Sequence, residues 1–220
     1  GPVAFWYDHK TRWVSDSINS IIANVAGDFQ DELGCPGEWQ PDCLRSLLQD
    51  PNGDGLYNFM TLGIPAGEYE AKVAFNQTWD VNYGADGVLD GDNIPFSVGE
   101  GQAVIFAFDP STNTLVIEAT DEIPATLLAA DASGGTGLPR PAAPFPDLVV
   151  VPGTIQSVLG CAGDWEPDCE ISALTYDEAD QLWYGSFELP AGDYEYKVAL
   201  NGSWDVNFGQ FAEGGGANIP

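Results

Sequence analysis

The chain has 220 residues, with 34 acidic and 6 basic side chains, so its formal net charge is -28. Phosphates repel a surface of that charge, which excludes nucleic-acid binding, and no apolar run approaches the roughly 20 residues that a membrane-spanning helix needs. Apolar residues make up 44% of the chain and aromatic residues 12%, which is enough for a folded core.

The first residues resemble a later part of the chain. Phe5-Trp6-Tyr7-Asp8 aligns with Phe106-Ala-Phe-Asp109, which belongs to two short strands predicted within residues 104–117 and joined by the turn 109–113. Residues 1–15 are therefore interpreted as the closing hairpin of a domain. The aromatic residues that this hairpin would donate to a sheet are Phe5, Trp6, Tyr7 and Trp13.

Two long segments occur twice in the chain. Residues 33–43 return as residues 159–169, and residues 65–84 return as residues 190–209. This repeat predicts two homologous domains, residues 16–119 and 148–220. The stretch 120–147 between them is rich in Gly, Ala and Pro, which is typical of a linker.

Apolar residues alternate with polar ones in both copies, as in Tyr69, Ala71, Val73 and Phe75 and again in Tyr194, Tyr196, Val198 and Leu200. This period of two predicts half-buried strands. Short strands with frequent turn signals favour an all-β fold of two tandem immunoglobulin-like β-sandwiches. Residues 28–33 and 124–130 are weak helix candidates.

The second domain stops at Asn218-Ile-Pro220, which is equivalent to Asn93-Ile-Pro95, and so lacks its own closing hairpin. An incomplete sandwich exposes unpaired backbone and apolar side chains. Three explanations are open: residues 1–15 of the same chain fill the gap, those of a neighbouring copy fill it, or the chain is a fragment of a longer array. We expect the neighbouring copy, because donor and acceptor then differ and the contact would propagate into a filament.

Four cysteines form two closely spaced pairs, one inside each repeat. Local loops of this size favour disulfides Cys35–Cys43 and Cys161–Cys169. A four-thiolate zinc site is the alternative, but it would need ligands from both domains. Disulfides place the chain outside the cytoplasm.

Repeated tryptophan motifs are the candidate carbohydrate sites. One tryptophan lies within each cysteine loop, and the sequences Trp79-Asp-Val-Asn-Tyr83 and Trp204-Asp-Val-Asn-Phe208 follow a predicted strand. Indole rings suit the flat faces of sugars, and carboxylates and amides bind hydroxyl groups. The alternative is structural, with the rings in the core and the polar side chains capping their own loops. The candidate residues are Trp39, Trp79, Asp80, Asn82, Tyr83, Trp165, Trp204, Asp205, Asn207 and Phe208.

No cofactor is expected, with calcium as the exception to be considered. Asp50, Asn52 and Asp54 alternate as in a calcium loop, but Thr61 stands where an EF-hand needs Glu, so a polar turn is the alternative. His9 is the only histidine, which argues against a Ser-His-Asp triad. No acidic residue lies in a recognisable enzyme motif, so we expect no enzymatic activity.

Taken together, the repeated motifs resemble the accessory immunoglobulin-like modules of bacterial pullulanases and amylopullulanases. The resemblance covers most of residues 1–119 and 148–220, although the chain differs in containing no catalytic domain. It implies an extracellular, non-catalytic module that contacts α-glucans. The sequence therefore leaves two hypotheses, an α-glucan-binding module whose copies join end to end, or a purely structural subunit of an extracellular fibre.

Overall fold

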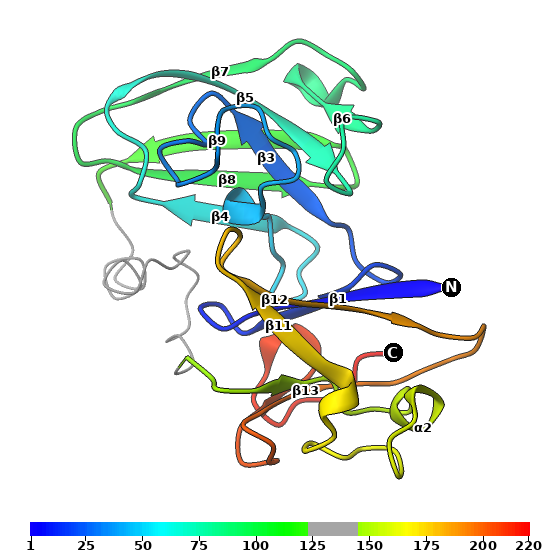
Figure 1. The fold of residues 1–220 in the computed structure, drawn as a ribbon. Helices are drawn as coiled ribbons and strands as arrows, with labels where there is room; N and C mark the ends of the chain where they lie inside the picture. Colours follow the sequence, from blue (N-terminus) through cyan, green and yellow to red (C-terminus); the bar gives the residue numbers. More distant parts are fainter. Residues whose placement is uncertain (123–144) are drawn as a thin grey trace. The chain divides into compact units, whose positions relative to one another are not determined.

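A computed structural model describes residues 1–122 and 145–220, and its regular structure is almost entirely β (Figure 1). The all-β class predicted from the sequence is confirmed. The described residues divide into two compact units. Residues 21–50 and 54–122 form the first sandwich, and residues 1–20, 51–53 and 145–220 form the second sandwich.

The first sandwich contains two antiparallel sheets. In one, β5 lies between β3 and β6 and also pairs with β7; in the other, β8 lies between β4 and β9. The strands are β3 (Ala23–Gly27), β4 (Tyr57–Thr61), β5 (Gly67–Phe75), β6 (Asn82–Tyr83), β7 (Ile94–Val98), β8 (Ala103–Asp109) and β9 (Thr114–Thr120).

Alternation of apolar residues places the core of the first sandwich between these sheets. On β5, Ala71 and Val73 are fully buried, and they pack in one cluster with Phe106 and Phe108 of β8. The two strands predicted within residues 104–117 are confirmed as β8 and β9, which are joined by a tight turn. Burial of these apolar faces is the main stabilising contribution in such a sandwich.

The second sandwich is built from the equivalent strands, contributed by both ends of the chain, but here pairing of β10 with β11 joins them into one continuous seven-stranded sheet. Its strands are paired in the order β14-β13-β10-β11-β12-β1-β2. They are β1 (Pro2–Asp8), β2 (Trp13–Asp16), β10 (Val149–Val150), β11 (Ala173–Asp177), β12 (Leu182–Glu188), β13 (Val198–Leu200) and β14 (Asn207–Phe208).

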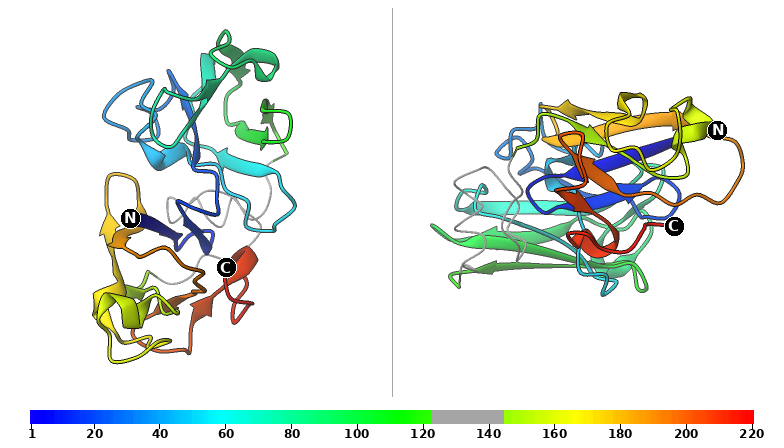
Figure 2. Two further views of the ribbon diagram at one scale, coloured as in Figure 1. Left: turned by 90° about the vertical axis from the view of Figure 1, so that its right-hand side faces the viewer. Right: turned by 90° about the horizontal axis from the view of Figure 1, so that it is seen from below.

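The N-terminal hairpin completes the second sandwich of its own chain. Strand β1 lies along β12 (Figures 1 and 2), and Phe5 faces Gly185 in the register in which Phe106 faces Phe59 in the first sandwich. The hairpin itself has the register of β8 and β9. Phe5 and Tyr7 are buried in the core of the second sandwich.

The prediction that this hairpin joins the sheet of a neighbouring chain is therefore wrong for this structure. Of the three explanations, the structure has the intramolecular one, in which the four aromatic residues Phe5, Trp6, Tyr7 and Trp13 are all buried within the chain. The unit that contains the hairpin also extends to Ser20, beyond the expected boundary at residue 15. An end-to-end filament consequently loses the open site on which it depended.

Helical structure is confined to single turns among the described residues. In the described ranges 1–122 and 145–220 the one α-helix is α2 (Gln156–Leu159), which lies in the second sandwich, whereas its predicted counterpart at residues 28–33 forms turns. The candidate helix at residues 124–130 and most of the expected linker 120–147 lie outside the described residues. The remaining short elements are 3-10 turns η1 (Leu44–Ser46), η2 (Ala85–Gly87), η3 (Glu170–Ser172) and η4 (Gln210–Ala212).

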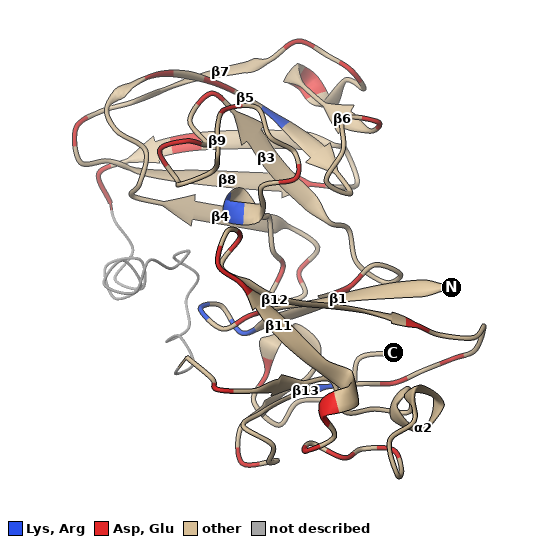
Figure 3. Cartoon of the chain, in the orientation of Figure 1, with Lys and Arg blue, Asp and Glu red and all other residues tan. Residues whose placement is uncertain are grey.

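Acidic residues lie mainly on the loops and turns of both sandwiches (Figure 3). This placement keeps most of the negative charge in water, because buried carboxylates would be costly without partners. In the described part of the chain, no helix has the length and hydrophobicity needed to cross a membrane.

Candidate functional site

Each sandwich displays a pair of tryptophans. In the first sandwich the ring centroids of Trp39 and Trp79 are 6.4 Å apart, with 42° between the ring planes. In the second sandwich Trp165 and Trp204 are 6.5 Å apart at 36°. The rings of Trp79 and Trp204 are exposed, at 37% and 39%, and their partners are half-buried. Each of these residues was predicted separately as a candidate binding residue, and the structure brings them together into two equivalent pairs.

The cysteine loop carries the first tryptophan of each pair. The predicted disulfides Cys35–Cys43 and Cys161–Cys169 are both formed. Trp39 and Trp165 have positive φ angles, 54° and 62°, a conformation that is unusual for a bulky residue. Because both copies adopt it, the loop holds its indole in place against an unfavourable backbone preference, which is typical of functional positions.

A buried glutamine in each sandwich fixes this loop, and the sequence reasoning missed it. Gln30 accepts a hydrogen bond from the Gln40 main-chain N–H at 2.7 Å, and its amide nitrogen donates to the Gln40 carbonyl at 2.9 Å. Gln156 makes the same two bonds to Glu166, at 2.7 and 2.8 Å. The signal was available, because Gln30 and Gln156 are separated by the repeat offset.

In the Trp-Asp-x-Asn loop of the first sandwich, some residues are exposed and others have a structural role. Asn82 is buried, and its amide donates to the Trp79 carbonyl at 3.0 Å and to the Asp90 carboxylate at 2.7 Å. Tyr83 packs on Phe75 with ring centroids 5.5 Å apart. Asp80 is exposed beside Trp79. The candidate binding groups are therefore Trp39, Trp79 and Asp80, whereas Asn82 and Tyr83 support them.

The second sandwich reproduces this division. The Asn207 amide donates to the Trp204 carbonyl at 2.9 Å, and Phe208 is buried against Tyr7 of the N-terminal hairpin. Asp205 is exposed. Its binding groups are therefore Trp165, Trp204 and Asp205, and the hairpin supports this loop through the contact of Tyr7 with Phe208.

The loop that contains the predicted calcium ligands Asp50, Asn52 and Asp54 is held by its own hydrogen bonds. The Asp50 carboxylate accepts from the main-chain N–H groups of Asp54 and Gly55, at 3.2 and 3.0 Å. The Asp54 carboxylate accepts from Leu56 at 2.9 Å. These bonds are those of a polar turn, and calcium binding stays a prediction. In the second sandwich, Cys161, Glu166 and Cys169 lie close together, but the two sulfurs are bonded to each other.

His9 lies in the turn of the N-terminal hairpin, as expected. It is buried, and this burial lowers its pKa, although the negative charge of Asp8 acts in the opposite direction. Its ring contacts Phe145 and Tyr176 at 5.0 and 6.2 Å between centroids. His9 is therefore packed against other aromatic rings in the hairpin turn.

Repeated sandwiches, disulfide-closed loops and tryptophan pairs define an accessory β-sandwich module of the kind that the sequence motifs resemble. The pullulanase X25 domain family matches residues 22–115 and 148–220. The chain belongs to this family, whose members are accessory modules of pullulanases.

Similar proteins are much longer than this chain. The chain is 36% identical over 201 residues to an amylopullulanase of Thermoanaerobacterium thermosulfurigenes, which covers 91% of the chain but 10% of that protein. It is 34% identical to the amylopullulanase of Thermoanaerobacterium saccharolyticum, covering 14% of it. A pullulanase structure from Bacillus acidopullulyticus aligns over 91% of the chain and 30% of that protein, with 18% identity and a TM-score of 0.40.

Proposed function

We propose that this chain is a non-catalytic module that binds α-glucan through one tryptophan pair on each sandwich. The observation that carries this proposal is the repetition of the pair with nearly the same ring separation and tilt. A structural requirement would be met by a buried ring, but Trp79 and Trp204 keep more than a third of their surface in water. Exposing an indole forgoes the stabilisation that its burial would bring.

The geometry of each pair suits a curved sugar chain. Two rings inclined at 42° or 36° present two faces that are not coplanar, so consecutive sugar units of a bent glucan can each stack on one ring. Asp80 and Asp205, exposed beside these rings, supply acceptors for sugar hydroxyl groups. The aliphatic residues Val81 and Val206 next to them are also exposed, at 38% and 42%, and widen the apolar surface.

Two further parts of the proposal rest on the disulfides and the relatives. Both disulfides are formed, which supports an extracellular location because thiols are kept reduced in the cytosol. The relatives are named amylopullulanases, and the chain corresponds to a small part of each. We infer that the module serves to hold α-glucan, while catalysis belongs to other domains of such enzymes.

Calorimetric titration with maltoheptaose tests this function. The wild-type chain should bind at two sites, Trp79→Ala and Trp204→Ala should each lose one site, and the double variant should lose detectable binding. Removal of one stacking ring is expected to weaken its site by about 5- to 150-fold, as for other aromatic contacts of about 1–3 kcal/mol.

Tyr184→Ala is the matched control, because this aromatic residue of β12 is similarly exposed, at 41%, but lies outside the pairs. Its titration should equal that of the wild type. If the folded double variant bound maltoheptaose as the wild type does, the tryptophan pairs would not be the binding sites and the proposal would fail.

A further inference from the structure

The second sandwich has a small cavity lined in part by the loop that follows Trp204. The volume of this cavity is about 370 Å³, and Arg12, Asp205, Val206 and Asn207 are among the residues that line it. Arg12 comes from the turn of the N-terminal hairpin, so two distant segments of the chain form the cavity within a single unit. The cavity shares Asp205 with the proposed glucan site of this sandwich.

Two residues that line this cavity each have a buried polar atom without a hydrogen-bond partner among the described residues. These atoms are Nε of Arg12, which is a donor, and Oδ1 of Asn207, which is an acceptor. The Asn207 amide nitrogen donates to the Trp204 carbonyl at 2.9 Å, and within residues 1–122 and 145–220 it makes no second hydrogen bond. Buried polar groups are rarely left unpaired in proteins, so this cavity suits a ligand that both donates and accepts.

The first sandwich has a carboxylate at the equivalent place. By the repeat offset, Asn207 corresponds to Asn82 and Gly215 to Asp90, and the main-chain N–H groups of Asp90 and Gly215 both donate to the carbonyl of their asparagine at 3.0 Å. The Asn82 amide donates to the Asp90 carboxylate at 2.7 Å, and its Oδ1 accepts from Lys72 at 3.4 Å. Because Gly215 has no side chain, the second sandwich lacks this partner for its asparagine.

The second sandwich also has a guanidinium group where the first has an amide. Arg12 corresponds to Asn113 by the alignment of the two hairpins, and both residues have positive φ angles, 65° and 58°. The guanidinium carbon of Arg12 lies 5.4 Å from the centre of the Phe208 ring, and this cation–π contact holds the side chain in place. No carboxylate of the described residues forms an ion pair with Arg12. Its hydrogen-bond donors are therefore available to a ligand in the cavity.

We propose that this cavity binds a glucose unit of the α-glucan that stacks on Trp204, so that the second sandwich has a sugar subsite which the first lacks. This inference rests on the proposed glucan binding. Sugar hydroxyl groups both donate and accept, so they accept from Arg12 and from the Asn207 amide and donate to Oδ1 of Asn207 and to Asp205. A carboxylate ligand fits less well, because Asp205 repels it and it has no hydrogen for Oδ1 of Asn207.

Titration of Trp79→Ala with maltoheptaose tests this subsite, because that variant keeps only the proposed site of the second sandwich. Adding Gly215→Asp supplies the carboxylate that Asp90 provides in the first sandwich, and this carboxylate engages the donors of Arg12 and Asn207. The affinity for maltoheptaose should then fall by about 10- to 150-fold, the usual contribution of hydrogen bonds to charged groups. Arg12→Asn, which introduces the residue of the first sandwich, should also weaken binding.

The backbone at Gly215 accommodates an aspartate. Its φ angle is 66°, close to the 53° of the equivalent Asp90, and a Cβ atom added to Gly215 would meet no other atom within 4 Å. Gly101→Asp is the matched control, because Gly101 also has a positive φ, 75°, and open space around its Cβ position, but lies in the first sandwich. It should leave the affinity of Trp79→Ala for maltoheptaose unchanged.

The same titrations separate failure of the subsite from failure of glucan binding. If Gly215→Asp and Arg12→Asn bound maltoheptaose as strongly as Trp79→Ala alone, the subsite would be refuted, while the tryptophan pair would still bind. If neither Trp79→Ala nor Trp204→Ala bound maltoheptaose, glucan binding and the subsite would both be refuted. Displacement of maltoheptaose by sodium acetate but not by sodium chloride would identify a carboxylate as the ligand of the cavity and would also overturn the proposal.

Discussion

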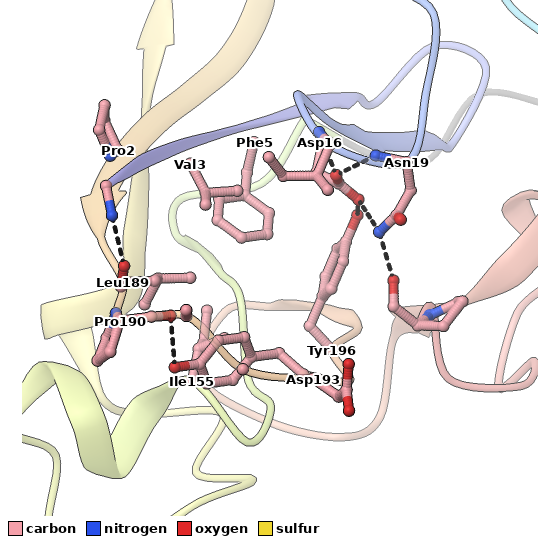
Figure 4. Close-up of a pocket in the computed structure, with 16 residues that line it drawn as sticks. Pro2, Val3, Phe5, Asp16, Asn19, Ile155, Leu189, Pro190, Asp193 and Tyr196 are labelled. Atoms are coloured by element: carbon pink, nitrogen blue, oxygen red, sulfur yellow. Dashed lines mark hydrogen bonds between the residues drawn. The ribbon is translucent and has the colours of Figure 1, made fainter.

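At the scale of single residues, a buried hydrogen bond ties the N-terminal hairpin to the rest of the second sandwich. The Tyr196 hydroxyl donates to the Asp16 carboxylate at 2.7 Å (Figure 4), and both side chains are nearly inaccessible to water. The other carboxylate oxygen of Asp16 accepts from the main-chain N–H groups of Ile18 and Asn19, both at 2.8 Å. Burial, reinforced by the charge of Asp16, raises the pKa of Tyr196 well above its usual value.

This pKa shift predicts that the second sandwich loses stability in alkali. An unfolded tyrosine ionises near pH 10, whereas folded Tyr196 stays neutral, so its contribution is complete below pH 10 and declines as the pH rises above that value. Tyr196→Phe should remove this part of the decline, leaving that of Tyr7, whose pKa burial also raises. At neutral pH the variant should be less stable by about 1–3 kcal/mol, the usual cost for a bond to a charged group.

Thermal unfolding of both proteins between pH 7 and 11 measures this effect. Tyr194→Phe is the control, because its hydroxyl bonds a carbonyl at the surface, and it should change the stability less at every pH. An unaltered pH dependence in Tyr196→Phe would show that this hydroxyl does not contribute as described.

At the scale of elements, strands, turns and disulfides could be predicted from the sequence, whereas contacts between distant segments could not. The period of two in β5 and the turn between β8 and β9 are encoded by neighbouring residues, and each cysteine pair spans a short loop, so these predictions were confirmed. Which sheet receives the N-terminal hairpin depends on a contact between residues more than 170 positions apart, such as Tyr7 and Trp183, and no local pattern reports it. The pairing of Trp39 with Trp79 was missed for the same reason.

The matched positions Phe5 and Phe106 test the role of the hairpin. Each lies in the core of its sandwich, on equivalent strands β1 and β8. Phe5→Ala should destabilise the second sandwich and Phe106→Ala the first, each by about 3–5 kcal/mol, because each substitution leaves a cavity in a packed core.

Hydrogen exchange resolved by residue distinguishes the two sandwiches. Amides of β12 should exchange faster in Phe5→Ala, and amides of β4 should exchange faster in Phe106→Ala. Unchanged exchange of β12 in Phe5→Ala would contradict the placement of the hairpin.

At the scale of the whole molecule, a chain with a net charge of -28 carries two copies of one apolar surface feature. The strong charge favours solubility and discourages non-specific association, so exposed indoles can be retained without promoting aggregation. The two proposed sites on one chain would also raise the apparent affinity for a polymer that engages both. These properties are those expected of a module that holds a long neutral polysaccharide.

The seven tryptophans provide the most direct test of glucan binding. Their indole N–H resonances should be followed by NMR while maltoheptaose is added. The four paired residues Trp39, Trp79, Trp165 and Trp204 should shift with increasing ligand, whereas Trp6, Trp13 and Trp183, all buried, should stay in place. If the four paired resonances did not move at saturating maltoheptaose, or if only the three buried ones moved, the tryptophan pairs would not be α-glucan sites.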